Sequence, residues 1–165
     1  MGMKVLIIYC SVHHGNTEKI VKAMAEVLDA EMVGIKDMRG RDLSEYGLIG
    51  FGSGIYFGTH HRSLLRFADK LPELRGKRGF IFSTSGIGNA GNMVHNIRLG
   101  ISHYHVPLRK KLAAKGLDIR GEFNCRGFDT AGPLKIIGGI RKGRPDKRDI
   151  KRARTFAAGL LEKLV

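Results

Sequence analysis

The apolar run at residues 4–9 constrains the fold of this chain more than any other feature. Four aliphatic residues follow one another from Val5 to Ile8, with no polar residue between them. Uninterrupted apolar strands are typical of parallel sheets that are buried on both faces. Residues 17–28 come next, and their apolar side chains recur at helical spacing. A buried strand followed by an amphipathic helix predicts an α/β fold.

The alternation of strand and helix continues along the chain. Further strands are predicted at residues 31–35, 48–52, 80–82 and 117–123. Helices are predicted at residues 17–28, 63–71, 92–115 in parts, and 146–164. Gly100 and Pro107 are expected to break the third of these helical segments. Because right-handed crossovers leave few arrangements, we expect one domain over residues 1–165, a doubly wound, three-layer α/β fold whose five-stranded parallel sheet has the order 2-1-3-4-5.

Length and composition exclude several classes of protein. The chain has 165 residues, enough for one domain with a substantial core. No apolar segment approaches the roughly 18 residues needed to span a bilayer, and the first residues show no signal-peptide pattern, so we expect a cytoplasmic protein. Two cysteines, Cys10 and Cys125, are too few for a disulfide scaffold. The predicted sheet separates them by roughly 14 Å, whereas a disulfide needs Cα atoms within about 7 Å.

The charge of the chain is strongly positive and unevenly distributed. The formal net charge is +14; residues 1–108 carry 13 basic and 9 acidic side chains, and residues 109–165 carry 16 basic and 6 acidic ones. Such a field attracts acidic proteins, nucleic acid or anionic lipid. A solvated basic surface that only maintains solubility is an equally good interpretation.

The segment after the first strand is rich in small and polar residues and leads directly into a helix. Backbone N–H groups and the helix dipole favour a phosphate at such a place, without any need for a lysine. Simple N-capping of the helix by Asn16 or Thr17 is the alternative. The segment is not a Walker A motif, because no Gly-Lys-Ser/Thr follows. The candidate phosphate-binding residues are Ser11, His13, His14, Gly15, Asn16 and Thr17.

This segment resembles the FMN-phosphate loop of flavodoxins, whose usual form is Ser-x-Thr-Gly-x-Thr. Here one more residue separates Ser11 from Gly15, and that spacing is similar to the menaquinone-dependent protoporphyrinogen oxidases of the flavodoxin superfamily. The resemblance covers essentially the whole chain by element order and by three loops. It implies a flavodoxin-like fold with FMN bound noncovalently where the first and third strands leave the sheet.

The segment after the third strand corresponds to the flavodoxin loop that packs an aromatic residue on the isoalloxazine ring. The resemblance assigns this contact to Tyr56 or Phe57, with Ile55 beside them, and places Gly58 at the peptide that meets flavin N5. A glycine makes reorientation of that peptide sterically easy. The alternative is that the two aromatic residues only close the core beneath the loop.

The segment after the fourth strand corresponds to the third FMN loop, whose backbone donors face the pyrimidine edge of the flavin. Its glycines also match the Gly-x-Gly-x-x-Gly fingerprint, but that fingerprint belongs after a first strand. Flavodoxins often carry an aromatic residue here, and this segment has none. The candidate residues are Thr84, Ser85, Gly86, Ile87, Gly88 and Asn89.

Two pairs of histidines follow the first and third strands, namely His13 with His14 and His60 with His61. Adjacent histidines diverge, and no set of carboxylates or cysteines completes a metal site. We therefore expect the histidines to line the flavin pocket or its rim and predict no metal. The hydrogen-bonding of His14 to the phosphate is one such role.

Three hypotheses for function follow. The first is an FMN-binding electron carrier with an acidic redox partner, for which no catalytic side chain is needed. The second is an FMN-dependent oxidoreductase of the quinone reductase or protoporphyrinogen oxidase type, which the long segment at residues 126–144 favours. The third is a flavin-free basic module; nucleic acid is disfavoured as its ligand because no aromatic residues are interleaved with the basic ones, and contact with a membrane surface stays open.

Overall fold

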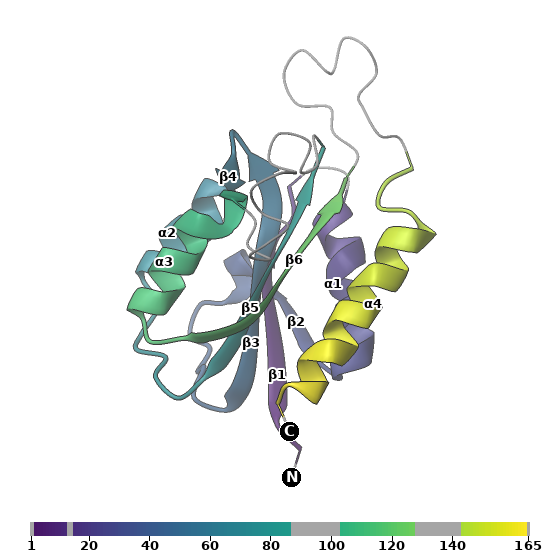
Figure 1. Cartoon of the computed structure of the whole chain (residues 1–165). Coiled ribbons are helices and arrows are strands. Elements are labelled where there is room, and N and C mark those ends of the chain that lie inside the picture. Colours follow the sequence, from purple (N-terminus) through teal and green to yellow (C-terminus); the bar gives the residue numbers. More distant parts are fainter. Residues whose placement is uncertain (1, 13–14, 87–102, 128–142, 165) are drawn as a thin grey trace.

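The computed structural model describes residues 2–12, 15–86, 103–127 and 143–164. A central sheet lies between two layers of helices (Figure 1). The strands are β1 (Lys4–Cys10), β2 (Glu31–Gly34), β3 (Tyr46–Tyr56), β4 (Thr59–His60), β5 (Arg78–Ser85) and β6 (Asp118–Arg126). The helices are α1 (Asn16–Leu28), α2 (Arg62–Asp69), α3 (Val106–Ala114) and α4 (Lys147–Glu162), with short 3-10 turns η1 (Ile35–Asp37) and η2 (His103–His105). None of the helices in these ranges has the length and apolar character needed to cross a membrane.

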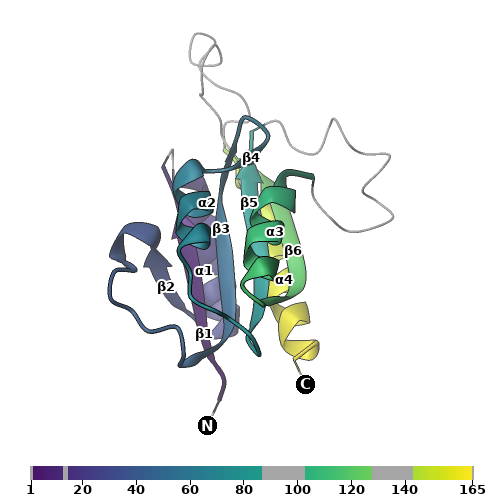
Figure 2. The ribbon, with the colours of Figure 1, turned by 90° about the vertical axis from the view of Figure 1, so that its left-hand side faces the viewer.

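The sheet has the order β2-β1-β3-β5-β6, and all pairs along this path are parallel. The predicted order 2-1-3-4-5 is therefore confirmed, because β4 lies off the path and pairs only with β3, antiparallel. Helices α1 and α4 cover one face of the sheet, and α2 and α3 cover the other (Figures 1 and 2).

Strand β1 is buried on both faces, as its apolar run predicts. Val5 and Ile7 belong to the core that faces α1 and α4. Leu6 and Ile8 belong to the core that faces α2 and α3. Successive side chains of a strand point to opposite faces, so an uninterrupted apolar run supplies both cores at once.

Glycines in β3 make room for phenylalanine rings of the neighbouring strand. A Cβ atom on Gly50 would lie 2.3 Å from the ring of Phe80, and one on Gly52 would lie 2.3 Å from the ring of Phe82. Both rings are fully buried. A larger side chain at either position would overlap with a ring of the neighbouring strand. This close approach explains why β3 contains glycines, although glycine has a low β-propensity.

Several predicted element boundaries are wrong. Strands β3 and β5 continue to Tyr56 and Ser85, because their polar residues remain paired in the sheet. A helix boundary lies at Pro107 as expected: α3 begins at Val106 and has Pro107 in its first turn, where its missing N–H is not needed. Gly100 lies outside the described residues.

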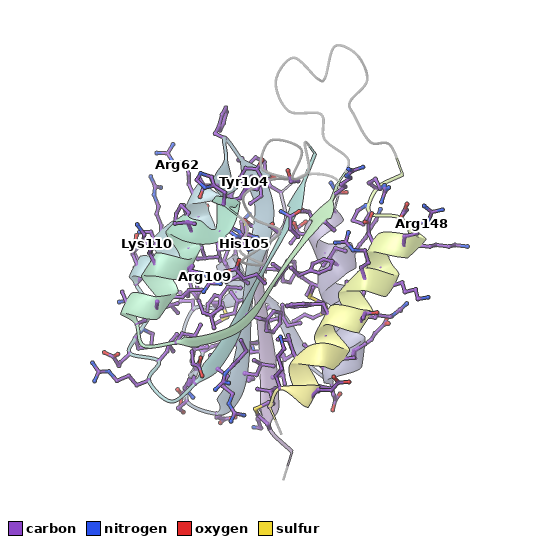
Figure 3. All side chains as sticks on the ribbon, in the orientation of Figure 1. Arg62, Tyr104, His105, Arg109, Lys110 and Arg148 are labelled. Carbon is purple, nitrogen blue, oxygen red and sulfur yellow. The ribbon has the colours of Figure 1, made fainter. Side chains whose placement is uncertain are left out.

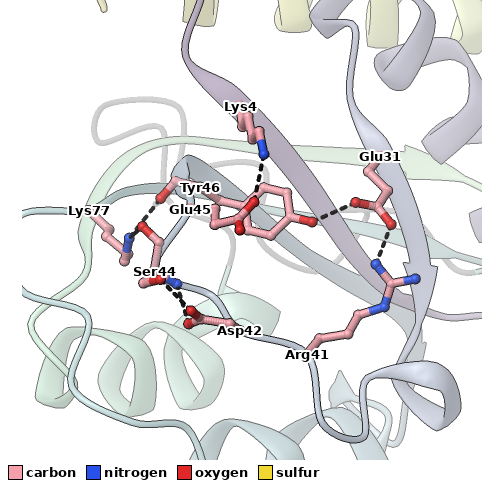
Figure 4. A network of polar contacts seen from close by, with 8 residues as sticks. All are labelled: Lys4, Glu31, Arg41, Asp42, Ser44, Glu45, Tyr46 and Lys77. Atoms are coloured by element: carbon pink, nitrogen blue, oxygen red, sulfur yellow. Dashed lines mark hydrogen bonds and ion pairs between the residues drawn. The ribbon is translucent and has the colours of Figure 1, made fainter.

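Polar contacts tie strands together at the amino edge of the sheet (Figure 4). The hydroxyl of Tyr46 donates to the carboxylate of Glu31 at 2.5 Å, and Arg41 pairs with the same carboxylate. Lys4 and Glu45 pair at 2.6 Å. Exposed pairs of this kind contribute little to stability, and they lie at the edge opposite to the predicted ligand loops.

Candidate functional site

The carboxyl ends of four strands meet at one edge of the sheet. The register pairs Cys10 with Ser53, Gly54 with Thr84, and Ser85 with Arg126. Ligands of open parallel sheets bind outside this edge. The predicted site residues at the ends of β1, β3 and β5 are therefore neighbours in space. Five of the predicted residues lie outside the described part of the chain, namely His13, His14, Ile87, Gly88 and Asn89.

The amino end of α1 follows the carboxyl end of β1 and lies at this edge of the sheet. Gly15 occupies the N-cap position with a positive φ of 63°, and as a glycine it has no side chain with which to cap the helix. Asn16 and Thr17 lie inside the helix, so neither of them is the capping residue. The first amides of a helix together with its dipole favour an anion.

Two contacts hold this helix end against the neighbouring strands. The hydroxyls of Thr17 and Thr84 lie 3.0 Å apart, and both residues are buried. Gly127 packs closely on Asn16, since a Cβ atom on Gly127 would lie 2.9 Å from the Asn16 side chain. Thr84 and Ser85 thus lie within β5 rather than in a loop, and the segment that follows β6 begins beside the amino end of α1.

Residues 53–60 form a hairpin where the sequence predicts an irregular loop. Tyr56 pairs with Thr59, and the two residues between them have positive φ, 51° at Phe57 and 81° at Gly58. Two such residues make a type I′ turn, which asparagine and glycine favour and phenylalanine does not. Phe57 is fully exposed, with a relative exposure of 108%. An aromatic ring in an unfavourable backbone conformation and without packing partners is the arrangement expected of a ligand contact.

Buried polar contacts anchor the hairpin from below. The Ser53 hydroxyl donates to the carbonyl of Gly54 at 2.8 Å and accepts from the backbone N–H of His61 at 3.0 Å. Its oxygen also lies 3.1 Å from Nδ1 of His60, which is fully buried. Burial, and then the neighbouring ring of His105 at 4.9 Å, hold the pKa of His60 well below its usual value of 6.5. His60 is therefore neutral near pH 7.

A second buried network links the α3 side of the molecule to the same edge. Nδ1 of His105 lies 3.1 Å from the carboxylate of Glu122, and its Nε2 lies 2.7 Å from the hydroxyl of Ser83. Asn124 donates to that hydroxyl at 3.0 Å, and Arg109 pairs with Glu122. Figure 3 shows His105 and Arg109 turned inward from α3 and η2, whereas Lys110 and Arg148 point outward.

This network fixes the charge of Glu122. Burial raises its pKa, but the hydrogen bond and charge of His105 and the charge of Arg109 outweigh burial, and the net pKa lies below 4.5. Ser83 is completely buried, so the group serves to position the ends of β5 and β6. Sequence reasoning missed it, although the alternation of Glu122 and Asn124 with apolar residues in β6 was a usable signal.

Neither cysteine forms a disulfide, and the sheet separates β1 from β6 by two strands. Burial raises the pKa of Cys125 to about 12 and also raises that of Cys10. Among the described residues, no three histidine, cysteine or acidic side chains are grouped as a metal site would require.

Comparison with known proteins agrees with this geometry. A family model for the flavodoxin domain matches residues 6–118. The chain is 44% identical over 160 residues to the uncharacterized protein MJ0298 of Methanocaldococcus jannaschii, covering 97% of this chain and 99% of that protein.

Solved structures share the fold. Flavodoxin 2 from Bacillus cereus, in its oxidised form, superimposes with a TM-score of 0.68 at 18% identity, covering 97% of this chain and 99% of the other. The flavodoxin of Fusobacterium nucleatum bound to flavin mononucleotide superimposes with a TM-score of 0.62 at 13% identity, covering 98% and 99%. The strand order, the position of the loops and the match to the family model together show that the chain belongs to the flavodoxin domain family.

Proposed function

We propose that this protein binds FMN noncovalently at the carboxyl edge of the sheet and uses it to transfer electrons. One observation carries the proposal: the exposed Phe57 at the tip of a strained turn lies on the same edge as the amino end of α1, where a glycine occupies the N-cap. The two features suit the two ends of FMN, a flat aromatic ring and a phosphate. When bound, FMN supplies the redox chemistry, and the protein binds and orients it.

The phosphate end of the proposed site consists of the residues that lead into α1. Thr17 can serve it while bonded to Thr84, because a hydroxyl accepts one hydrogen bond and still donates another. We assign the phosphate to Ser11, Gly15, Asn16 and Thr17, together with His13 and His14.

The ring end consists of the hairpin and the segment after β5. We assign the isoalloxazine contact to Phe57, flanked by Ile55 and Tyr56. A Cβ atom on Gly58 would meet nothing within 4 Å, so the space around its peptide is open and reorientation toward flavin N5 is unhindered. We assign the pyrimidine edge to Gly86 together with Ile87, Gly88 and Asn89, which lie outside the described residues.

The redox partner that we propose is an acidic protein, and the location that we propose is the cytoplasm. Arg126 and Arg148 are exposed near the proposed flavin edge, where a positive field steers acidic molecules. Arg144, by contrast, is 2.7 Å from Asp149 and 3.2 Å from Asp146 at the start of α4. Because these ion pairs of Arg144 stabilise the start of α4, Arg126 and Arg148 are the better residues for charge-reversal experiments.

Release of the cofactor by acid, followed by chromatography, tests the proposal. We expect FMN; FAD, or no flavin after reconstitution, would refute it and would favour a flavin-free basic module. Thr17→Ala should weaken FMN by about 1–3 kcal/mol, because a phosphate-facing donor is lost, and should leave riboflavin affinity nearly unchanged. Thr17→Ser keeps the hydroxyl and is the matched control. Equal losses for FMN and riboflavin would place the phosphate elsewhere.

An FMN-dependent oxidoreductase is the second candidate. The observation in its favour is the contact of Gly127 with Asn16. Because of this contact, the long segment after β6 begins beside the proposed phosphate site. Steady-state oxidation of NAD(P)H with a quinone, or of a porphyrinogen with a quinone acceptor, separates the two: sustained turnover supports an enzyme, and reduction without turnover supports a carrier.

A further inference from the structure

A cavity of about 520 Å³ opens between the end of β1, the turn η1 and helix α2. It lies on the side of the sheet that α2 covers, since Cys10, one of its lining residues, belongs to the core facing α2 and α3. None of the residues to which we assign FMN lines it. Its volume is within the range of roughly 300–1,000 Å³ that is usual for small-molecule sites.

Three basic side chains line this cavity, namely Lys36, Arg66 and Lys70, and no carboxylate does. None of the three has an ion-pair partner among the described residues. Some other cations of the described residues do form ion pairs, as Arg41 does with Glu31 and Lys111 with Asp69. Like charges that share one cavity repel each other unless an anion neutralises them.

The remaining walls are largely apolar. Phe67 and Ile35 are only partly buried, and Val12 is 50% exposed, one of the few large aliphatic residues on the surface of the described chain. An inorganic anion would leave these groups in contact with water. A molecule with an apolar body and an anionic group would satisfy both kinds of wall.

The floor of the cavity connects to the hairpin. Nδ1 of His61 lies 3.5 Å from the thiol of Cys10, and the His61 ring meets the ring of Tyr56 edge-on at 5.2 Å. A molecule in the cavity would therefore contact His61, whose ring packs against Tyr56 of the hairpin.

We infer that this cavity is a second binding site, which takes a small organic anion with a flat apolar body, such as an aromatic carboxylate, sulfonate or phosphate ester. The cations hold the anionic group, and Phe67, Ile35 and Val12 cover the apolar body. The inference does not depend on the proposed FMN function, because the two sites share no assigned residue.

The probe for the test is 8-anilinonaphthalene-1-sulfonate, an aromatic anion that fluoresces when it is bound. We expect saturable one-to-one binding to the wild-type protein, and weaker binding of the neutral analogue N-phenyl-1-naphthylamine. Lys36→Gln combined with Arg66→Gln should weaken the sulfonate roughly tenfold or more, because two charge-assisted contacts are lost. The matched control is Arg62→Gln with Lys110→Gln, two exposed cations of the α2 and α3 layer outside the cavity, which should change the affinity less than twofold.

Nuclear magnetic resonance locates the probe independently of the variants. The ring protons of His61 should shift on saturation with the sulfonate. The titration is carried out with and without saturating FMN, so that a failure of FMN binding is detected separately. Binding that is not saturable, equal affinity for the neutral analogue, equal losses in the cavity and control variants, an unmoved His61 signal, or competitive displacement by FMN would each overturn the inference.

Discussion

Replacing Phe57 by asparagine should stabilise the flavin-free protein and weaken its hold on FMN. An L-residue other than glycine, asparagine or aspartate loses about 1–2 kcal/mol in the left-handed region that Phe57 occupies at a φ of 51°. The ring is fully exposed, so its removal gives up no packing. Asn-Gly is the favoured sequence of this turn, and we expect a gain of about 1 kcal/mol in the free energy of unfolding.

The expected loss in FMN affinity comes from the ring contact. The contact between two aromatic rings contributes about 0.5–1.5 kcal/mol. Burial of the apolar area of a partly covered ring adds about 1 kcal/mol to this. Phe57→Asn should therefore raise the Kd of FMN by a factor of about 30.

Urea unfolding of the flavin-free protein and fluorescence titration with FMN measure the two effects. Phe57→Tyr keeps both the ring and the backbone conformation and is the control; it should change neither quantity much. A lower stability of Phe57→Asn would show that the turn is not strained. An unchanged Kd would show that Phe57 does not contact the flavin.

Two further predictions concern the interior. Because the pKa of buried His60 lies well below 6.5, the unfolded chain binds a proton that the folded one does not, and stability should fall as the pH drops below about 6.5, by at most ~1.4 kcal/mol per pH unit. In urea unfolding at several pH values, His60→Asn and His60→Gln should both flatten this slope; a slope equal to that of the wild type would contradict a neutral His60. Gly52→Ala should destabilise the fold by about 1–3 kcal/mol, since its Cβ would lie 2.3 Å from the ring of Phe82. A double-mutant cycle with Phe82→Leu should recover part of that loss, and strictly additive effects would argue against the overlap.

The predicted strands end too early in the sequence for a physical reason. Ser53 and Gly54 of β3, and Ser83 and Thr84 of β5, are polar or small, which is typical of loops when residues are considered one at a time. In the folded chain, neighbouring strands on both sides provide hydrogen-bond partners for their backbones, and pairing continues. The local sequence pattern indicates which side chains are buried, whereas the length of a strand depends on the neighbouring strands with which it pairs.

Sequence alone determined the architecture and the edge at which the ligand loops lie. Uninterrupted apolar strands must be buried on both faces, and alternation with amphipathic helices then leaves a doubly wound parallel sheet with few possible orders. The start of a helix directly after β1 also follows from sequence, because the apolar residues of 17–28 recur at helical spacing.

Tertiary structure alone decided which polar residues meet. His60 and His105 stack 4.9 Å apart although 45 positions separate them in sequence, and the group of Ser83, Glu122 and Arg109 gathers side chains from two strands and a helix. The strain at Phe57 and the grouping of Lys36, Arg66 and Lys70 around one cavity depend likewise on where the chain places them. Periodicity identifies which face of an element is buried, but the partner of each polar group is fixed only when distant segments pack, because hydrogen bonds and ion pairs act over a few ångströms in space and not along the chain.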